Sequence, residues 1–149
     1  MQRAILSQKK SRSQRGQSLI EFTLVMPVLL LVATGVVSFG LAIHNDLVLT
    51  NAVNTGAQAL AFSRGQTTDP CATAYSAISG AAPTLTSNLT VSYVINGTTY
   101  SSNTCTGGAS NMLPGANAQI TATYACTLAV FRGNYAPCSL QAQVAEVIQ

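Results

Sequence analysis

The hydrophobic pattern divides the chain into a basic start, one long apolar run and a polar remainder. From Leu19 to Ile43 the residues are apolar apart from Glu21 and a few small polar side chains, and Phe22–Ile43 carries no charge over 22 residues. A helix rises about 1.5 Å per residue, so this stretch spans roughly 33 Å, the thickness of a bilayer's hydrocarbon core. The pattern predicts one membrane-spanning helix.

Helical spacing continues beyond this apolar run. Leu49, Val53, Gly56 and Leu60 follow one another in three- and four-residue steps, which is the spacing of one helix face. Three alanines widen the stripe: Ala52, Ala57 and Ala61. We therefore expect one long helix from about Ser18 to Phe62, and its outer half has a narrow apolar face that needs a partner.

A short second helix is expected after the long one. Asp69 followed by Pro70 has the residue types preferred at a helix N-cap and first helical position. We expect this helix to run to about Ser79, where Gly80 ends it.

Beyond the short helix the hydrophobic period changes to two, which is the period of strands. Residues 89–95 alternate and lead into Asn96-Gly97, the preferred dipeptide of a type I′ hairpin turn. Further strands are expected at 98–102, at 118–130 and in the C-terminal segment from Leu140. The polar segment 103–117 reads as an exposed loop. The expected fold class is α+β, with the long N-terminal transmembrane helix packed by a short helix and a small antiparallel sheet.

Four widely spaced cysteines point to disulfides. Cys71, Cys105, Cys126 and Cys138 form no C-x-x-C pair, and the chain has one histidine, so zinc-ribbon and thioredoxin-like chemistry is excluded and no metal is expected. Two disulfides would place this part of the chain in an oxidising compartment. Three pairings are possible. We favour Cys126 with Cys138, because a short segment between them joins two expected neighbouring strands, which leaves Cys71 with Cys105.

The charges are few and unevenly distributed. Charged residues make up 7% of the chain, where about 25% is usual. Five of the seven basic residues precede the apolar run: Arg3, Lys9, Lys10, Arg12 and Arg15. After residue 16, two basic and four acidic residues leave a net charge of −2, so no nucleic-acid-binding surface is expected. The basic leader predicts a cytoplasmic N-terminus and an external C-terminal part.

Catalysis has little support in the sequence. His44 is close to Asp46, but both fall where the helix would leave the bilayer, and we interpret them as polar interface residues. Nucleophile-elbow, phosphate-loop and paired-carboxylate motifs are missing from the sequence. We expect neither enzymatic activity nor a cofactor.

The segment Arg15–Phe22 carries the most specific motif. It combines a basic leader, Gly16, Gln17, Glu21 and a long apolar helix, and it resembles the class III signal of type IV prepilins. The Glu-Phe pair and the apolar residues after it are similar to the TadE-type pseudopilins of the tight-adherence (Tad or Flp) pilus machinery. This resemblance covers about residues 15–61 and does not separate an E-type from an F-type minor pilin.

The resemblance implies a set of partners and roles. A membrane aspartyl protease, the prepilin peptidase, would cut after Gly16 and make Gln17 the new N-terminus. The apolar helix, with Glu21, Phe22 and Pro27, would then assemble with other pilin subunits on an inner-membrane platform. The protein would be a single-pass protein of the bacterial inner membrane, with a periplasmic C-terminal domain, and would become extracellular within a pilus.

Physical reasoning supports this interpretation of Glu21. Placing a carboxylate at the centre of a membrane helix costs about 2.5–3.5 kcal/mol of free energy, and less near the interface. We therefore expect Glu21 to have a partner or a function. The amine of Gln17 on a neighbouring subunit would provide one. Alternatively, Glu21 extends to the cytoplasmic interface. Pro27 removes one helical hydrogen bond, which either creates a flexible point for packing or is a tolerated membrane proline.

These expectations give four segments along the chain: leader 1–16, transmembrane helix 17–43, its external continuation 44–63, and a disulfide-containing α+β domain 64–149. Two alternatives to a pilin remain. One is an uncleaved single-span membrane protein whose external domain binds a partner or ligand. The other is a secreted adhesin released by signal peptidase near Phe39–Ala42.

Overall fold

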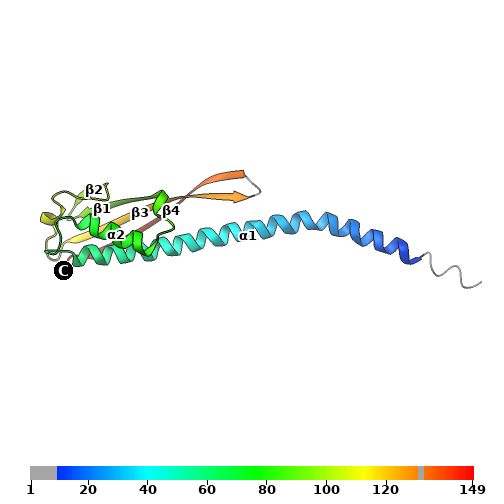
Figure 1. The fold of residues 1–149 in the computed structure, drawn as a ribbon, viewed down its shortest axis with the longest axis horizontal. Coiled ribbons are helices and arrows are strands. Elements are labelled where there is room, and N and C mark those ends of the chain that lie inside the picture. Colours follow the sequence, from blue (N-terminus) through cyan, green and yellow to red (C-terminus); the bar gives the residue numbers. More distant parts are fainter. Residues whose placement is uncertain (1–9, 131–132) are drawn as a thin grey trace, which may run out of the picture.

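The computed structural model describes residues 10–130 and 133–149, and the side chains of 18–126 and 138–149. The long helix α1 covers Lys10–Phe62, 53 residues. It ends where the sequence predicts and begins earlier than the expected Ser18, because the basic residues at its start are good helix formers. Residues 1–9 of the leader, which include the basic residues Arg3 and Lys9, lie outside the described residues. Figure 1 shows α1 as a rod, with the rest of the fold beside its C-terminal part.

The short helix α2 spans Pro70–Ala81 and is capped by Asp69. The Asp69 carboxylate accepts a hydrogen bond from the Ala72 N–H at 3.0 Å, which satisfies one of the free donors at a helix start. The end predicted at Ser79 and Gly80 is wrong. The Ala82 N–H still donates to the Ile78 carbonyl, and the helix stops where Pro83 follows, since the residue before a proline disfavours helical geometry.

The sheet is antiparallel and has four strands in the order β2-β1-β3-β4. Its strands are β1 Leu89–Ile95, β2 Thr98–Tyr100, β3 Asn117–Val130 and β4 Gly133–Val147. Asn96 and Gly97 join β1 to β2 with φ angles of 49° and 79°, which confirms the type I′ turn.

Two strand boundaries and one loop differ from the expectation. β2 ends at Tyr100, before the expected 102. β4 begins at Gly133, before the expected Leu140, because it pairs with β3 from Val130↔Gly133 onward. The segment expected to be an exposed loop contains a short 3-10 helix, Gly108–Asn111, and its Met112 is 4% exposed. A second 3-10 turn, Thr86–Asn88, leads into β1.

The core lies between one face of the sheet and the two helices. Every residue of the predicted apolar stripe on α1 is buried, and the stripe packs on α2, β3 and β4. The largest buried side chains come from all layers: Tyr93, Leu49, Leu60, Ile78, Ile95 and Ile120. The outer half of α1 thus has the partner that its narrow apolar face requires.

Strands β3 and β4 continue beyond the rest of the sheet. The last β1 partner of β3 is Tyr124, whereas the β3–β4 pairing runs on to Val130 and Gly133. The remaining two-stranded part, residues 125–130 and 133–139, is called the outer ribbon. Figure 1 shows it projecting from the sheet toward the N-terminal half of α1.

Candidate functional site: the exposed apolar helix

The apolar half of α1 is exposed along its whole length. From Leu19 to Ile43 the large hydrophobic side chains are at least 39% exposed, and Leu24 reaches 72%. Soluble monomers rarely expose a continuous apolar surface of this size. By length and composition α1 can cross a membrane, and a single apolar helix at this end of the chain fits a single-pass membrane protein.

The predicted cleavage and assembly residues lie at the start of this surface. Gly16 and Gln17 belong to the continuous helical backbone of α1, and the side chain of Gln17 lies outside those described. Glu21 is exposed one helical turn after Gln17, and Phe22 beside it is 61% exposed. The helix therefore carries one carboxylate at the edge of its apolar surface.

Phe22 and Pro27 are brought together on one side of α1. They line a shallow apolar hollow of about 410 Å³, completed by Thr23, Met26 and Leu30. Pro27 has no N–H to donate to the Thr23 carbonyl, and the Thr23 hydroxyl donates to the Leu19 carbonyl at 2.7 Å. Figure 1 shows α1 changing direction within its apolar half, as a proline inside a helix causes.

A stripe of small residues that we did not predict runs along the outer part of the apolar segment. Gly35, Ser38, Ala42 and Asn45 are half-buried, while the large apolar residues around them are exposed. These four residues lie on the same face of α1 as the buried Leu49, because they precede it in three- and four-residue steps. Small polar side chains were noted in this segment from the sequence but were assigned to no helix face. The stripe could have been predicted from its small residues, which recur at helical spacing.

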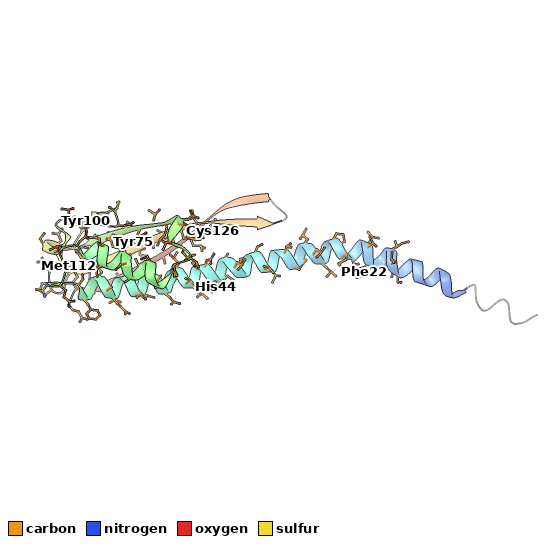
Figure 2. All side chains as sticks on the ribbon, viewed as in Figure 1. Phe22, His44, Tyr75, Tyr100, Met112 and Cys126 are labelled. Atoms are coloured by element: carbon orange, nitrogen blue, oxygen red, sulfur yellow. A yellow bond between two sulfur atoms is a disulfide. The ribbon has the colours of Figure 1, made fainter. Side chains whose placement is uncertain are left out.

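His44 and Asp46 do not form a catalytic pair. Both side chains are exposed, and residues two apart on a helix do not face each other. Figure 2 shows His44 between the domain and the apolar half of the helix, where a polar residue at a membrane boundary would lie.

The cysteines pair as favoured from the sequence. Cys71 is bonded to Cys105 and Cys126 to Cys138, with Cα–Cα distances of 5.4 Å and 4.8 Å. The first disulfide is buried at the start of α2. The second joins directly opposite residues of β3 and β4, at the base of the outer ribbon.

Asp69 has a second role that sequence reasoning missed. Besides capping α2, its Oδ1 accepts a hydrogen bond from the Cys105 N–H at 3.0 Å. Potential ligand atoms of Asp69, Cys71 and Cys105 lie within 4.8 Å of one another, but the disulfide uses both sulfur atoms. The arrangement is a structural link between α2 and the loop after β2.

The architecture places the protein in a structural class. A long apolar helix, exposed at one end and packed at the other by a short helix and a small antiparallel sheet, is an α+β pilin-like fold. Residues 16–58 match the family of TadE-like proteins, which confirms the resemblance inferred from the sequence and identifies the long helix as TadE-like. The match includes Glu21, Phe22 and Pro27 and ends before α2. Comparisons with curated proteins and with solved structures gave no match. The match covers the long helix alone, so it shows similarity to TadE-like proteins over residues 16–58 and does not extend to α2 or the sheet.

Proposed function

We propose that this protein is a structural minor pilin, or pseudopilin, of a Tad-like type IV pilus or secretion apparatus. The observation that carries the proposal is the continuity of α1. One helix carries both the exposed apolar surface and the face that anchors the folded domain, and the TadE-like match covers this junction. Such a helix can move from a bilayer into a bundle of similar helices while its domain stays folded. The role is structural and does not involve catalysis.

The proposed activation step is cleavage after Gly16 by prepilin peptidase. The site lies within helical backbone, so the helix has to open locally before an extended segment can enter a protease groove. Glycine favours this opening, since it destabilises a helix by about 1 kcal/mol relative to alanine and has no side chain. The basic residues before the site keep the cleaved bond on the cytoplasmic side.

Assembly is proposed to use Glu21. Cleavage creates an α-amino group at Gln17, about 6 Å along the helix axis from Glu21. Pairing Glu21 with the amine of a neighbouring copy would neutralise two charges in an apolar bundle, where each alone is costly. Because one carboxylate meets one amine, the pairing would also set the axial offset between subunits.

The proposed location follows from this sequence of steps. The leader is cytoplasmic, α1 crosses the bacterial inner membrane, and the domain folds in the periplasm, where its disulfides can form. The partners are prepilin peptidase, other pilin subunits and the inner-membrane assembly platform. Incorporation in a pilus would carry the domain outside the cell.

Incorporation into sheared surface filaments tests the assembly role. In cells with an active Tad apparatus, we expect Glu21→Ala to reduce the amount of this protein in the filament fraction at least tenfold. Asp46→Ala is the matched control, because Asp46 is an exposed acidic residue on the same helix, outside the apolar span. It should be incorporated normally. Wild-type incorporation of Glu21→Ala would contradict the proposed pairing.

A further inference from the structure

We propose that a hollow at the C-terminal end of α1 binds a neutral sugar ring. The inference goes beyond the proposed function, because it concerns neither cleavage nor assembly and holds whether or not the chain enters a filament. The hollow has a volume of about 350 Å³, which lies within the range of small-molecule pockets, about 300–1,000 Å³. Its lining comes from the end of α1, the turn after it and the start of α2: Ala59, Phe62, Ser63, Gln66, Thr67 and Thr73.

This hollow lies far from the exposed apolar half of α1. From Ile43 to Ala59 the helix rises about 24 Å. Figure 1 shows this end of α1 beside the C-terminus of the chain, at the opposite end of the fold from the apolar half, and the Gln149 N–H donates to the Ala61 carbonyl there at 3.4 Å. A dissolved ligand therefore reaches the hollow while the apolar half of α1 is inside a bilayer or a bundle of helices.

The wall of the hollow that α1 provides is apolar. Ala59 and Phe62 are three residues apart on the helix and therefore share a face. Phe62 is 54% exposed, so its ring is available beside the hollow and is not part of the core. An aromatic ring offers a flat apolar surface, which matches the C–H face of a sugar ring.

The hydroxyl groups in the lining present hydrogen-bond acceptors. The Ser63 hydroxyl donates to the Leu60 carbonyl at 2.8 Å. The hydroxyls of Thr67 and Thr73 both donate to the Asp69 carbonyl, at 3.4 Å and 3.2 Å. A hydroxyl oxygen can also accept two hydrogen bonds, and among the described residues only the Asp69 N–H uses this capacity, by donating to the Thr67 oxygen at 3.1 Å. The three oxygens therefore retain acceptor capacity for a ligand that brings O–H donors.

Gln66 adds both donors and an acceptor to the hollow. Its side chain is exposed and makes no hydrogen bond to another residue in the described part of the chain. A side-chain amide offers two N–H donors and one carbonyl acceptor. Gln66 can therefore donate to a ligand oxygen and accept from a ligand hydroxyl at the same time.

These requirements select one class of ligand. An anion would face the free acceptors with no cationic side chain in the lining. An apolar ligand would remove water from the hydroxyl oxygens without replacing its hydrogen bonds, which is unfavourable. An organic cation would lack an acidic partner, because the Asp69 carboxylate already accepts from the N–H groups of Ala72 and Cys105. A neutral sugar ring has hydroxyls along its edge and C–H groups on its face, so it matches both parts of the lining.

Sugar binding to the full chain tests the inference directly. The protein is purified in a polyoxyethylene detergent, because glucoside detergents would themselves be ligands. The probes are glucose, galactose and N-acetylglucosamine, each also tested as the terminal ring of a disaccharide. We expect saturation-transfer NMR signals from the ring protons of at least one probe, with chemical-shift changes in the protein confined to residues 59–73.

The outcomes of this titration are distinct. Tighter binding of a disaccharide would assign the hollow to the end of a glycan chain, and equal binding of the monosaccharide would assign it to a free sugar; both support the inference. Absence of saturable binding by every probe would overturn it. Binding of methylammonium in place of the sugars would overturn it as well, because the hollow would then be a cation site.

Substitutions on the surface of the hollow locate the binding. Phe62→Ala and Gln66→Ala change exposed side chains, and each should weaken sugar binding about fivefold. Gln58→Ala is the matched control, because Gln58 is an exposed glutamine of α1 outside the hollow, and it should bind as wild type does. Melting temperatures equal to wild type would show that the variants fold. Wild-type affinity in both Phe62→Ala and Gln66→Ala would overturn the inference.

Discussion

Gly56 of α1 lies directly against Ile78 of α2. A Cβ added at Gly56 would overlap Cγ1 of Ile78, and would lie 2.8 Å from its Cδ1 and 3.2 Å from the Ala74 carbonyl oxygen. Ile78 is fully buried and is stiff at χ1, so it cannot simply move aside. The close approach of the two helices therefore requires glycine at position 56.

This contact predicts that Gly56→Ala destabilises the domain. Overpacking costs about 1–3 kcal/mol, and the higher helix propensity of alanine returns up to about 1 kcal/mol. We expect a net loss of about 1–2 kcal/mol in the free energy of unfolding, measured by denaturant titration in detergent. Gly80→Ala is the control: Gly80 is exposed within α2 and has no described atom near its Cβ position. It should be stabilising, and equal effects at both sites would refute the packing argument.

Asp69 links two segments, so its removal should cost more than a lost cap. Asp69→Ala removes acceptors for the N–H groups of Ala72 and Cys105, and we expect a loss of about 1–3 kcal/mol in the free energy of unfolding. Asp69→Asn keeps an acceptor oxygen and should retain most of the stability. Hydrogen exchange at Cys105 is the specific measurement, because loss of its acceptor should accelerate exchange there. Unchanged protection in Asp69→Ala would contradict the assigned link.

The buried hydroxyl of Tyr93 leads us to expect that the stability of the domain depends on pH. Its side chain is fully buried, and its hydroxyl has no hydrogen-bond partner among the described residues. Burial raises the pKa of this hydroxyl above its ordinary value near 10, and the charges of Tyr75 and Asp69 raise it further. Below about pH 10 the group is neutral in both folded and unfolded chains. Above that pH the unfolded chain ionises first, so stability falls as pH rises.

Tyr93→Phe separates this effect from the other tyrosines. At neutral pH the variant should be as stable as wild type or more stable by up to about 1 kcal/mol, because an unpaired buried hydroxyl is removed. From pH 10 upward it should lose less stability than wild type. The check is denaturant unfolding of both proteins between pH 7 and pH 11. A parallel decline of the two proteins would show that Tyr93 does not titrate as assigned.

The residues that follow a regular pattern were predictable from the sequence. Leu49, Val53 and Leu60 have helical spacing and are buried together, and Asn96-Gly97 specifies its turn by local backbone preference alone. The start of β4 was not predictable in this way. Residues 133–139 include Gly, Asn and Pro, which are typical of loops. Pairing with β3 and the Cys126–Cys138 bond make them a strand.

In the candidate site, too, residues that belong to a local pattern could be predicted, and features that depend on tertiary structure could not. Glu21, Phe22 and Pro27 were recognisable because they form part of a short motif, and the family match includes them. The outer ribbon was not recognisable, since it forms only because β3 and β4 pair beyond the last β1 partner. Most of the stripe from Gly35 to Asn45 lies within the apolar run, where the surrounding large apolar residues dominate the hydropathy and its small residues give no separate signal. The link between Asp69 and Cys105 joins positions 36 residues apart, a separation that local patterns do not encode.

The mature N-terminus is the most direct test of the central claim that this chain is a processed pilin subunit. Intact mass and N-terminal sequencing of the membrane-purified protein, from cells with active prepilin peptidase, should show a chain that begins at Gln17. Gly16→Ala should abolish this product and leave the leader attached. An unprocessed wild-type chain that begins at Met1 would contradict the account and favour an uncleaved membrane-anchored domain, while a start near Ile43 would indicate secretion after signal peptidase cleavage.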